Sequence, residues 1–297
     1  MLYPFILRPL AEEQWVPPRI DLWDLVTPYG YGGPFAWGNA FAAGDVFWRE
    51  VEDWLHARRV VCSFLRLSLF PDELLGFPGE VIPRSMNVVR SLNLSDDELW
   101  RDYEHKVRKN VKRALRSSVS VNIEYDGSRI GSFIDIYVET MERRSANEFY
   151  RFGPQFFERL VDELVGNFAF AYASVNGQVV STELILVSAG RVYSFLGGTR
   201  TNAFDMRPND LLKHEVIMWA RDAGKREYVL GGGYVEGDGI LRYKRSFAPS
   251  GLTPFHIATK VHDHRSLDEL VRRRGEVARR AGYHWVAREE WFPPYRS

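Results

Sequence analysis

Residues 231–247 combine glycines with side chains that can take part in chemistry. The sequence is GGGYVEGDGILRYKRSF, in which Arg242, Lys244 and Arg245 flank Tyr243 just after a glycine-rich segment. The pattern G-x-x-x-x-G-K-[ST] is absent and no long helix is expected to follow, so a phosphate-binding P-loop is not predicted. Glycines allow a ligand to approach the backbone closely, and open α/β sheets usually bind ligands at strand ends. We therefore predict that these glycines form the floor of a binding site.

The segment STELIL places a carboxylate on a predicted strand. Strict alternation puts Ser181, Glu183 and Ile185 on one face of that strand. A carboxylate among apolar neighbours has a raised pKa and can accept a proton, whereas at an exposed strand edge it would only be a solvated residue. Tyr193, on the adjoining strand, offers a phenol as a proton donor, with a packed core aromatic as the alternative.

Three other reactive side chains do not form a recognisable site. His214 follows Asp210 by four residues, but no second His or Cys stands at ligand spacing, so no metal site is predicted. The hydrolase pattern G-x-S-x-G is absent. Cys62, the single cysteine, lies in the apolar run VVCSFLRLSLF, where a buried thiol is expected rather than a nucleophile.

The first half of the chain is expected to contain both strands and helices. Apolar spacing predicts a helix over 45–59. Ser95 and Glu98 form an S-x-x-E capping pattern, which predicts a helix from there to about Arg116. Strands are expected at 5–8, 60–69, 86–94 and 119–125.

The second half has clearer signals. Asn176 and Gly177 separate two alternating apolar runs, which indicates a β-hairpin, while Pro208 and Gly224 mark the start and stop of a helix. Helices are expected at 130–145, 153–166, 208–223, 239–248 and 265–281, and strands at 168–175, 178–188, 191–198, 227–232 and 252–261. A mixed sheet with helices on its faces is the compact way to bury this order of elements.

Composition excludes several classes of protein. The chain has 297 residues, about right for two domains, and its apolar and aromatic content is typical of globular proteins. Lysine plus arginine equals aspartate plus glutamate at 39 each, so no overall charge attracts nucleic acid or an acidic membrane. The start MLYPFILRPL lacks the features of a secretory signal and no run of about 18 apolar residues occurs, which favours a cytoplasmic protein.

One local concentration of charge departs from this balance. The helix expected to end near Arg116 is rich in cations, which form either a solvated face or a surface that follows the backbone of a nucleic acid. These basic residues are His105, Lys106, Arg108, Lys109, Lys112, Arg113 and Arg116.

Four stretches resemble a known group of enzymes. KVRKNVKRALRSSVSV looks like a basic helix and strand of that group, and LGGTRTNAFDMRPNDLLKHEVIMWARDAGKREYVLGG is similar to its loop, helix and strand. GDGILRYKRSF resembles the ending G-x-x-x-F-K-x-x-F with Tyr243 in place of Phe, and TPYGYGGP looks like a loop of acetyltransferase-type relatives. Together with the element order of 126–262, they resemble a GNAT acyltransferase domain, and two such domains in one chain resemble the FemA/FemB/FemX group.

This resemblance implies an α/β (α+β) fold of two tandem GNAT-like lobes, each a mixed, largely antiparallel sheet flanked by helices. The lobes would span 1–125 and 126–262. A C-terminal helix and aromatic tail, 263–297, would pack on the body.

Members of the group join an activated acyl group to an amine. The reaction needs a neutral amine, a proton acceptor and positive charge near the developing oxyanion. The resemblance implies that Lys244 faces the reacting carbonyl, and on this chemistry Glu183 would accept the amine proton and Tyr193 would serve the leaving group. Residues expected to bind the donor are Arg200, Asn209, Lys213, Gly232, Gly233 and Tyr243. Those expected to bind the acceptor are Tyr29, Tyr31, Trp37, Arg143 and Arg144, and those expected to contact tRNA are Lys109, Lys112, Arg113 and Arg116.

The donor distinguishes the candidate functions. Relatives use aminoacyl-tRNA or acyl thioesters, and the acetyl-CoA-binding pattern R/Q-x-x-G-x-G/A is absent from RTNAFDMRPND. With the basic helix, this favours a FemX-like aminoacyltransferase that moves an aminoacyl group from aminoacyl-tRNA to a primary amine. The alternatives are an acyl-CoA-dependent N-acyltransferase, such as an N-acetyltransferase, and a non-catalytic protein that binds a peptide or RNA. No permanently bound cofactor, metal, DNA partner or transmembrane segment is expected, and the protein is predicted to be a monomer.

Overall fold

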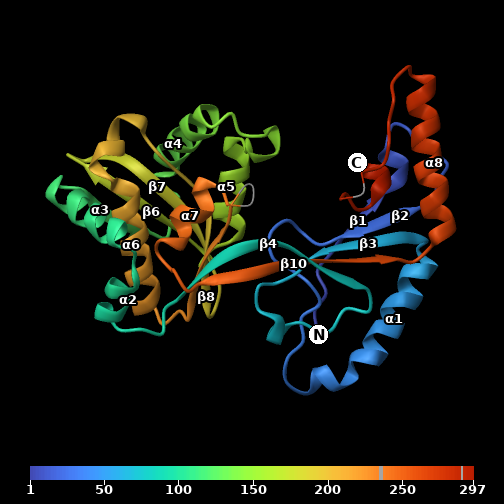
Figure 1. The fold of residues 1–297 in the computed structure, drawn as a ribbon, viewed down its shortest axis with the longest axis horizontal. Coiled ribbons are helices and arrows are strands. Elements are labelled where there is room, and N and C mark those ends of the chain that lie inside the picture. Colours follow the sequence, from blue (N-terminus) through green and yellow to red (C-terminus); the bar gives the residue numbers. More distant parts are fainter. Residues whose placement is uncertain (234–236, 289) are drawn as a thin grey trace. The chain divides into compact units, whose positions relative to one another are not determined.

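The chain folds into two compact units, which Figure 1 shows as ribbons coloured along the sequence. The computed structural model describes residues 1–233, 237–288 and 290–297. Unit 1 consists of Met1–Ser85 and Pro254–Ser297, and unit 2 of Met86–Thr253. These bounds differ from those of the expected lobes because the chain returns to unit 1 after residue 253.

Unit 1 contains strands in the order β1-β2-β3-β10. Their bounds are Ile6–Pro9 for β1, Trp23–Val26 for β2, Val60–Arg66 for β3 and Leu252–Val261 for β10. The β2–β3 pair is parallel, and the β1–β2 and β3–β10 pairs are antiparallel. Helices α1 (Gly44–Ala57) and α8 (His264–Arg280) pack on β3. The strand predicted at 252–261 was expected to be the last of the second lobe. In the structure it is β10 and pairs with β3 of unit 1, with Ile257 opposite Arg66.

The C-terminal tail completes a core of unit 1. Tyr295 is fully buried, and its hydroxyl donates to Asp24 Oδ2 at 3.1 Å. Arg296 Nε donates to the same oxygen at 2.6 Å, and Arg8 Nε donates to Asp24 Oδ1 at 2.6 Å. Two guanidinium groups thus compensate a fully buried carboxylate, whose removal from water would otherwise be costly.

Unit 2 contains a mixed sheet with strands in the order β4-β9-β8-β7-β6-β5. Their bounds are Glu80–Ser91 for β4, Ser120–Glu124 for β5, Phe168–Val175 for β6, Gln178–Val187 for β7, Arg191–Thr199 for β8 and Glu227–Gly232 for β9. The β8–β9 pair is parallel and the other pairs are antiparallel. The helices are α2 (Asp96–Asp102), α3 (His105–Arg116), α4 (Ile130–Arg143), α5 (Pro154–Glu163), α6 (Pro208–Asp222) and α7 (Gly239–Arg245).

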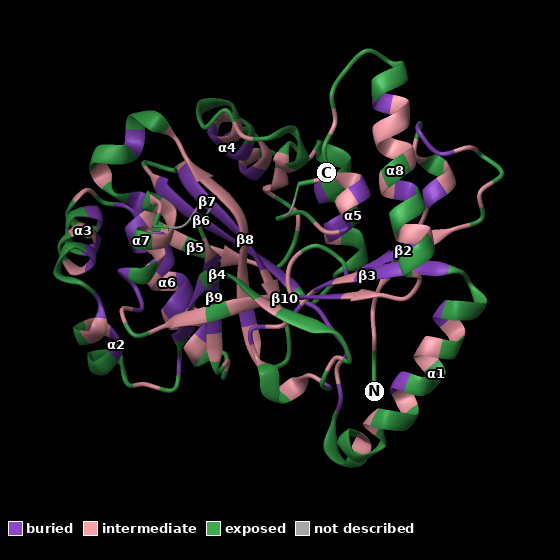
Figure 2. Cartoon of the chain, turned by 45° about the vertical axis from the view of Figure 1, so that its right-hand side comes forward, coloured by how far each residue is buried: buried purple, intermediate pink, exposed green. Residues whose placement is uncertain are grey.

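The sequence FAFAYASV of β6 explains the two layers of helices in unit 2. Phe168, Phe170 and Tyr172 point to one face and pack in a core with residues of α4 and α5. Ala171 and Ala173 point to the other face, where their small side chains leave room for the apolar residues of α3 and α6. Figure 2 shows the buried residues of β6 and β7 between these helices.

Local signals were read correctly in several places. Asn176 and Gly177 both have positive φ, 51° and 77°, as a type I′ hairpin turn requires, and Gly224 ends α6 with φ of 72°. Ser95 and Glu98 form the capping box at the start of α2.

The prediction of a single helix from Ser95 to about Arg116 is wrong, because the helix is interrupted between the end of α2 at Asp102 and the start of α3 at His105. Tyr103 has extended backbone angles and is buried, with its ring edge-on to those of His214 and Phe247. Burying this ring in the core outweighs the continuation of the helix. None of the described helices is long and apolar enough to cross a membrane.

The parallel pair β8–β9 separates after a short contact. Its register runs from Arg191 opposite Glu227 to Tyr193 opposite Val229 and stops there. Beyond this point β8 continues beside β7, and β9 continues beside β4. The sheet of unit 2 therefore opens between Ser194 and the end of β9.

Candidate active site

Lys213 lies at the opening between β8 and β9 and is almost completely buried. The second turn of α6 carries it, and its ammonium donates to Glu183 Oε1 at 2.5 Å, Ser194 Oγ at 2.8 Å and Tyr228 Oη at 3.0 Å. A lysine ammonium has three protons to donate, and this one has three acceptors. We refer to these four residues as the Lys213 cluster. Because its protons are used inside the protein, Lys213 is not available for the donor phosphate that the sequence assigned to it.

Glu183 is the anion of the cluster. Its side chain is 3% exposed, and Oε1 accepts bonds from both Lys213 and the Tyr228 hydroxyl. Oε2 is buried and has no hydrogen-bond partner among the described residues. The alternation that put Glu183 and Ile185 on one face is correct, and the alternative of an exposed strand edge is wrong, because the carboxylate is buried against the ammonium of Lys213.

The tyrosine that reaches Glu183 is Tyr228 on β9, which the sequence analysis missed. Burial raises the pKa of Tyr228 well above its usual value, and the charge of Glu183 raises it further. Tyr193 precedes Ser194 on β8, and alternation directs its side chain to the opposite face of the sheet. The structure therefore does not bring Tyr193 into the cluster. A signal for Tyr228 existed in EYVLGG, where it alternates with Leu230 toward α6.

Lys244 lies half-buried on α7, with Nζ donating to the carbonyl oxygen of Gly232 at 2.7 Å. The pKa of Lys244 is lowered to about 8, mainly by burial and also by the positive charge of Lys213, while Glu183 and Asp238 act in the opposite direction. With this pKa, about 90% of the side chains still carry the charge at pH 7. Lys244 is thus a cation near neutrality that interacts electrostatically with Lys213 and Glu183.

The start of α7 fixes where Lys244 lies. Asp238 caps the helix by accepting a hydrogen bond from the backbone N–H of Leu241 at 2.7 Å. A Cβ on Gly233 would lie 2.5 Å from Asp238 Oδ1, so glycine is required for this close approach. The glycine-rich floor was expected over 231–239, of which 234–236 lie outside the described residues.

A second polar group surrounds the N-terminus of α6. Asn209 Nδ2 donates to the Tyr243 hydroxyl at 2.7 Å, and Asn110 Nδ2 donates to Asp210 Oδ1 at 3.1 Å. Asp210 is buried in the first turn of α6, and this burial raises the pKa of its carboxyl group. Asp210 and Asn110 were missed as candidates. A carboxylate already occupies the end of the helix where an anion of the donor was expected.

Arg143 and Arg200 converge on Glu139 of α4. Arg200 lies 3.2 Å from a Glu139 oxygen and Arg143 lies 3.6 Å from the other. Arg143 also donates to Thr201 Oγ1 at 3.1 Å, while Arg144 is exposed. The two arginines that meet are thus one from the expected acceptor set and one from the expected donor set.

The remaining acceptor candidates belong to unit 1. Tyr29 and Trp37 are 58% and 56% exposed, and Tyr31 packs edge-on against Phe255. Trp37 stacks with Phe35 at 6.4 Å between ring centroids. Tyr29 and Trp37 are thus accessible, and their stacking on an acceptor stays a prediction.

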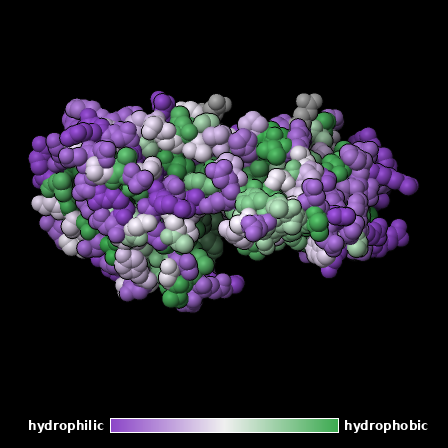
Figure 3. Space-filling view, turned by 90° about the horizontal axis from the view of Figure 1, so that it is seen from below, coloured by the Kyte–Doolittle hydropathy of each residue, from purple (hydrophilic) through white to green (hydrophobic). Residues whose placement is uncertain are grey.

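The four residues expected to contact tRNA are all exposed on α3. Val107, Val111 and Ala114 of the same helix are buried, so the cations occupy its solvent side. Within the part of the chain that the structure describes, no carboxylate forms an ion pair with Lys109, Lys112, Arg113 or Arg116. Figure 3 shows mainly hydrophilic side chains at the end of unit 2 where α2 and α3 lie.

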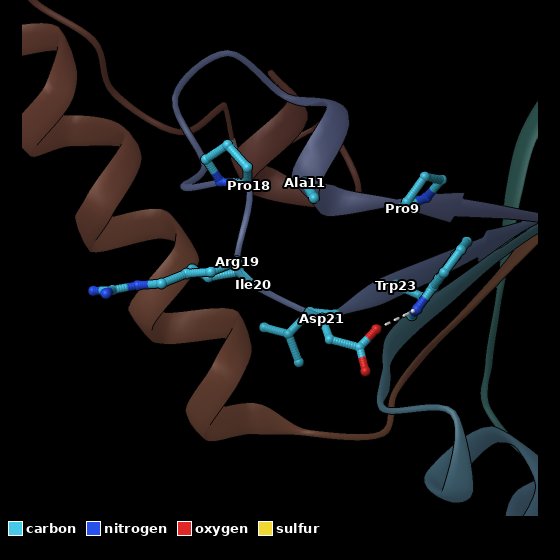
Figure 4. Close-up of a pocket in the computed structure, with 8 residues that line it drawn as sticks. Pro9, Ala11, Pro18, Arg19, Ile20, Asp21 and Trp23 are labelled. Atoms are coloured by element: carbon cyan, nitrogen blue, oxygen red, sulfur yellow. Dashed lines mark hydrogen bonds between the residues drawn. The ribbon is translucent and has the colours of Figure 1, made fainter.

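A separate pocket in unit 1 is a poor candidate for the site. Its volume is about 170 Å³, below the roughly 300 Å³ at which small-molecule sites usually begin. Figure 4 shows its residues, among them Asp21, whose carboxylate accepts a hydrogen bond from Trp23 Nε1 at 3.0 Å. The described residues contain no group of His, Cys, Asp and Glu placed to hold a metal.

Comparisons with known proteins agree with the fold. Residues 101–245 match the family model of the acetyltransferase (GNAT) domain. The chain is similar to the crystal structure of FemX, with a TM-score of 0.67 and 14% identity over 86% of this chain and 84% of that one. It is also similar to the C-terminal domain of a putative lysylphosphatidylglycerol synthetase from Agrobacterium fabrum, with a TM-score of 0.55 and 15% identity over 80% and 78% of the chains. L-PGS from Bacillus licheniformis gives 0.55 and 12% over 86% and 82%. No curated protein matches the chain.

The matched segment contains the candidate site. Residues 101–245, which contain the Lys213 cluster and Lys244, match the model of the acetyltransferase (GNAT) domain over just under half of the chain. The chain as a whole has a fold similar to that of FemX.

Proposed function

We propose that the protein is an acyltransferase that moves an aminoacyl group from aminoacyl-tRNA to a primary amine. The observation that carries this proposal is the arrangement of Lys244 beside the Lys213 cluster, where β8 and β9 separate. It supplies a half-buried cation and a carboxylate oxygen that has no hydrogen-bond partner among the described residues, and aminolysis of an ester requires these two groups.

In the proposed reaction, the nitrogen of the acceptor amine attacks the carbonyl carbon of the aminoacyl ester. The C–N bond forms as the carbonyl electron pair moves to oxygen, and the ammonium of Lys244 stabilises this oxyanion. Glu183 Oε2 takes a proton from the nitrogen. When the oxyanion collapses, the C–O bond to the tRNA ribose breaks, and the same proton passes to the ribose oxygen. The products are an amide and uncharged tRNA, and Tyr193 takes no part in this scheme.

Two features support tRNA as the carrier of the acyl group. The exposed cations of α3 can follow a phosphate backbone, and each contact would add to the salt dependence of binding. At the N-terminus of α6, the buried carboxylate of Asp210 would repel a pyrophosphate, and the segment RTNAFDMRPND has no glycine to bring N–H groups onto one.

The decisive experiment detects the product. Purified protein is incubated with charged tRNA and a library of primary amines, and mass spectrometry looks for amides that carry an aminoacyl group. Lys244→Ala serves as the inactive control, since it removes the cation that faces the oxyanion. Absence of every such amide with the native protein would reject the proposed activity.

Binding of tRNA is tested separately through salt dependence. The logarithm of the affinity for tRNA should fall linearly with the logarithm of the salt concentration. We expect Lys112→Ala with Arg113→Ala to make this line less steep by about 2, since each phosphate contact contributes about 1 to the steepness. The matched control is Arg279→Ala with Arg280→Ala, which removes the same charge from exposed positions of α8. If both double variants bind tRNA with the same slope as the native protein, α3 is not the contact surface.

An acyl-CoA-dependent N-acyltransferase is the second candidate, favoured by the acetyltransferase description of the matched family. A thioester that binds only the folded protein and is present at a concentration of 100 times its Kd would stabilise the protein by about 2.7 kcal/mol. A rise in Tm with acetyl-CoA, together with acylated product, would favour this candidate over tRNA. Binding of tRNA or peptide without product from any donor would favour the non-catalytic alternative.

A further inference from the structure

We infer that Lys213 is a positioning residue, whose ammonium holds the Glu183 carboxylate so that Oε2 faces the acceptor amine. This inference rests on the proposed function and gives Lys213 a role different from donor binding. Lys213 itself touches no substrate in this scheme. It acts through Glu183, which receives the proton.

The first argument is geometric. Four elements contribute to the Lys213 cluster, namely α6, β7, β8 and β9, and they meet where the parallel pair ends. The three bonds of Lys213, between 2.5 and 3.0 Å, fix the position of Glu183 Oε1. The Tyr228 hydroxyl donates to the same oxygen. Since the carboxylate is planar and Oε1 is held from two sides, the direction of Oε2 is determined as well.

The second argument is a comparison within the chain. Unit 1 contains another lysine and glutamate pair, in which Lys260 Nζ donates to Glu52 Oε1 at 2.6 Å. There the second oxygen, Oε2, lies 3.1 Å from His262 Nδ1, so both carboxylate oxygens have partners. Glu183 has two partners on one oxygen and none among the described residues on the other. The cluster of unit 2 thus differs from the lysine and glutamate pair of unit 1 in leaving one buried carboxylate oxygen for another group to bind.

The third argument concerns electrostatics. Glu183 faces Lys213 and the Tyr228 hydroxyl, and Lys244 is influenced by Lys213, Glu183 and Asp238. Removing the charge of Lys213 would therefore raise the proton affinity of Lys244, because an ammonium loses a like charge.

The test compares pH profiles of acyl transfer for Lys213→Met and the native protein. We expect kcat to fall roughly 100-fold from misplacement of the base, with the KM for the donor unchanged. The alkaline limb of the profile, which depends on the charged form of Lys244, should move to higher pH by about one unit. Lys260→Met, which breaks the pair of unit 1, should leave this limb in place. A Lys213→Met protein with native kcat and a native alkaline limb would overturn the inference.

Lys213→Arg is the second variant, in case Lys213→Met does not fold. It keeps the charge, but a planar guanidinium cannot place its protons on the same three acceptors. We expect the alkaline limb to stay in place while kcat falls at least tenfold. Native kcat in this variant would show that the geometry of Lys213 is not needed, and would likewise overturn the inference.

A measurement without substrate separates this inference from the proposed function. The rate at which acetic anhydride acylates Lys244 is followed against pH by peptide mass spectrometry, in the native protein and in Lys213→Met or Lys213→Arg. With Lys213→Met the midpoint should move to higher pH, and with Lys213→Arg it should not. If no donor gives product but this shift occurs, the proposed reaction fails while the coupling between the two lysines stands. Unchanged midpoints in Lys213→Met would contradict the coupling.

Discussion

The stability of the protein should depend on pH through Lys244. An ordinary lysine has a pKa near 10.5, and in the folded protein that of Lys244 is about 8. Between these values the unfolded chain binds a proton that the folded protein does not. Stability contributed by this group is therefore complete above pH 10.5 and is lost as pH falls through 8. Lys244→Met removes the titration and keeps a side chain of similar length.

The size of the effect follows from the two pKa values. Because Lys244 binds its proton more weakly in the folded protein than in the unfolded chain, it lowers the free energy of unfolding. The two pKa values give a loss of about 3 kcal/mol at pH 7 and about 2 kcal/mol at pH 9. When the pH rises from 7 to 9, the free energy of unfolding of the native protein should therefore increase by about 1 kcal/mol more than that of Lys244→Met. The comparison cancels the lost hydrogen bond to Gly232, because that loss is the same at both values of pH in the variant.

Urea unfolding at pH 7 and pH 9 measures the free energies of both proteins. Lys109→Met is the control, since this exposed ammonium stays in water in the folded protein, and its pH dependence should follow that of the native protein. If Lys244→Met shows the same change between pH 7 and 9 as the native protein, Lys244 is not desolvated in solution. The argument that places it beside the reacting carbonyl would then lose its electrostatic support.

Three further predictions concern the scaffold, and urea unfolding measures each. Deleting residues 292–297 removes two of the partners of the buried Asp24 carboxylate, and we expect a loss of at least 3 kcal/mol, with Asp24→Asn partly rescuing the truncated chain. Gly198→Ala should cost about 1 to 3 kcal/mol, because a Cβ would lie 2.3 Å from Thr140 Oγ1; an unchanged midpoint would refute that close contact. Ser95→Ala should cost about 1 kcal/mol through loss of the capping box, and a neutral effect would contradict its role.

Much of the fold could be predicted from local signals in the sequence. The hairpin at Asn176, the cap at Ser95 and the stop at Gly224 each depend on a conformation that few residue types adopt, so the residue types reveal it. The break at Tyr103 and the pairing of β10 with β3 depend on contacts between distant parts of the chain. The residues next to these features in the sequence therefore do not predict them.

The candidate site shows the same limit. The alternation in STELIL gave the correct face for Glu183, but the neighbours on that face come from α6, β8 and β9. Lys213 is a polar residue at an otherwise apolar position of its helix, between Leu212 and Val216. That departure from the pattern was the available signal for a buried ammonium, but the sequence analysis assigned Lys213 to donor binding near the helix N-terminus. Only the fold shows which carboxylate it meets.

Burial and the charges of the site explain why Lys244 would be held in an unfavourable state before the reaction. Burial is the main reason that the charged form of Lys244 is disfavoured, and the positive charge of Lys213 adds to it, while Glu183 and Asp238 act in the opposite direction. An oxyanion formed beside Lys244 would supply a further negative charge at the moment of attack. An interaction that is stronger in the transition state than in the ground state accelerates the chemical step, whereas an ammonium already neutralised by a carboxylate would gain little from the same oxyanion.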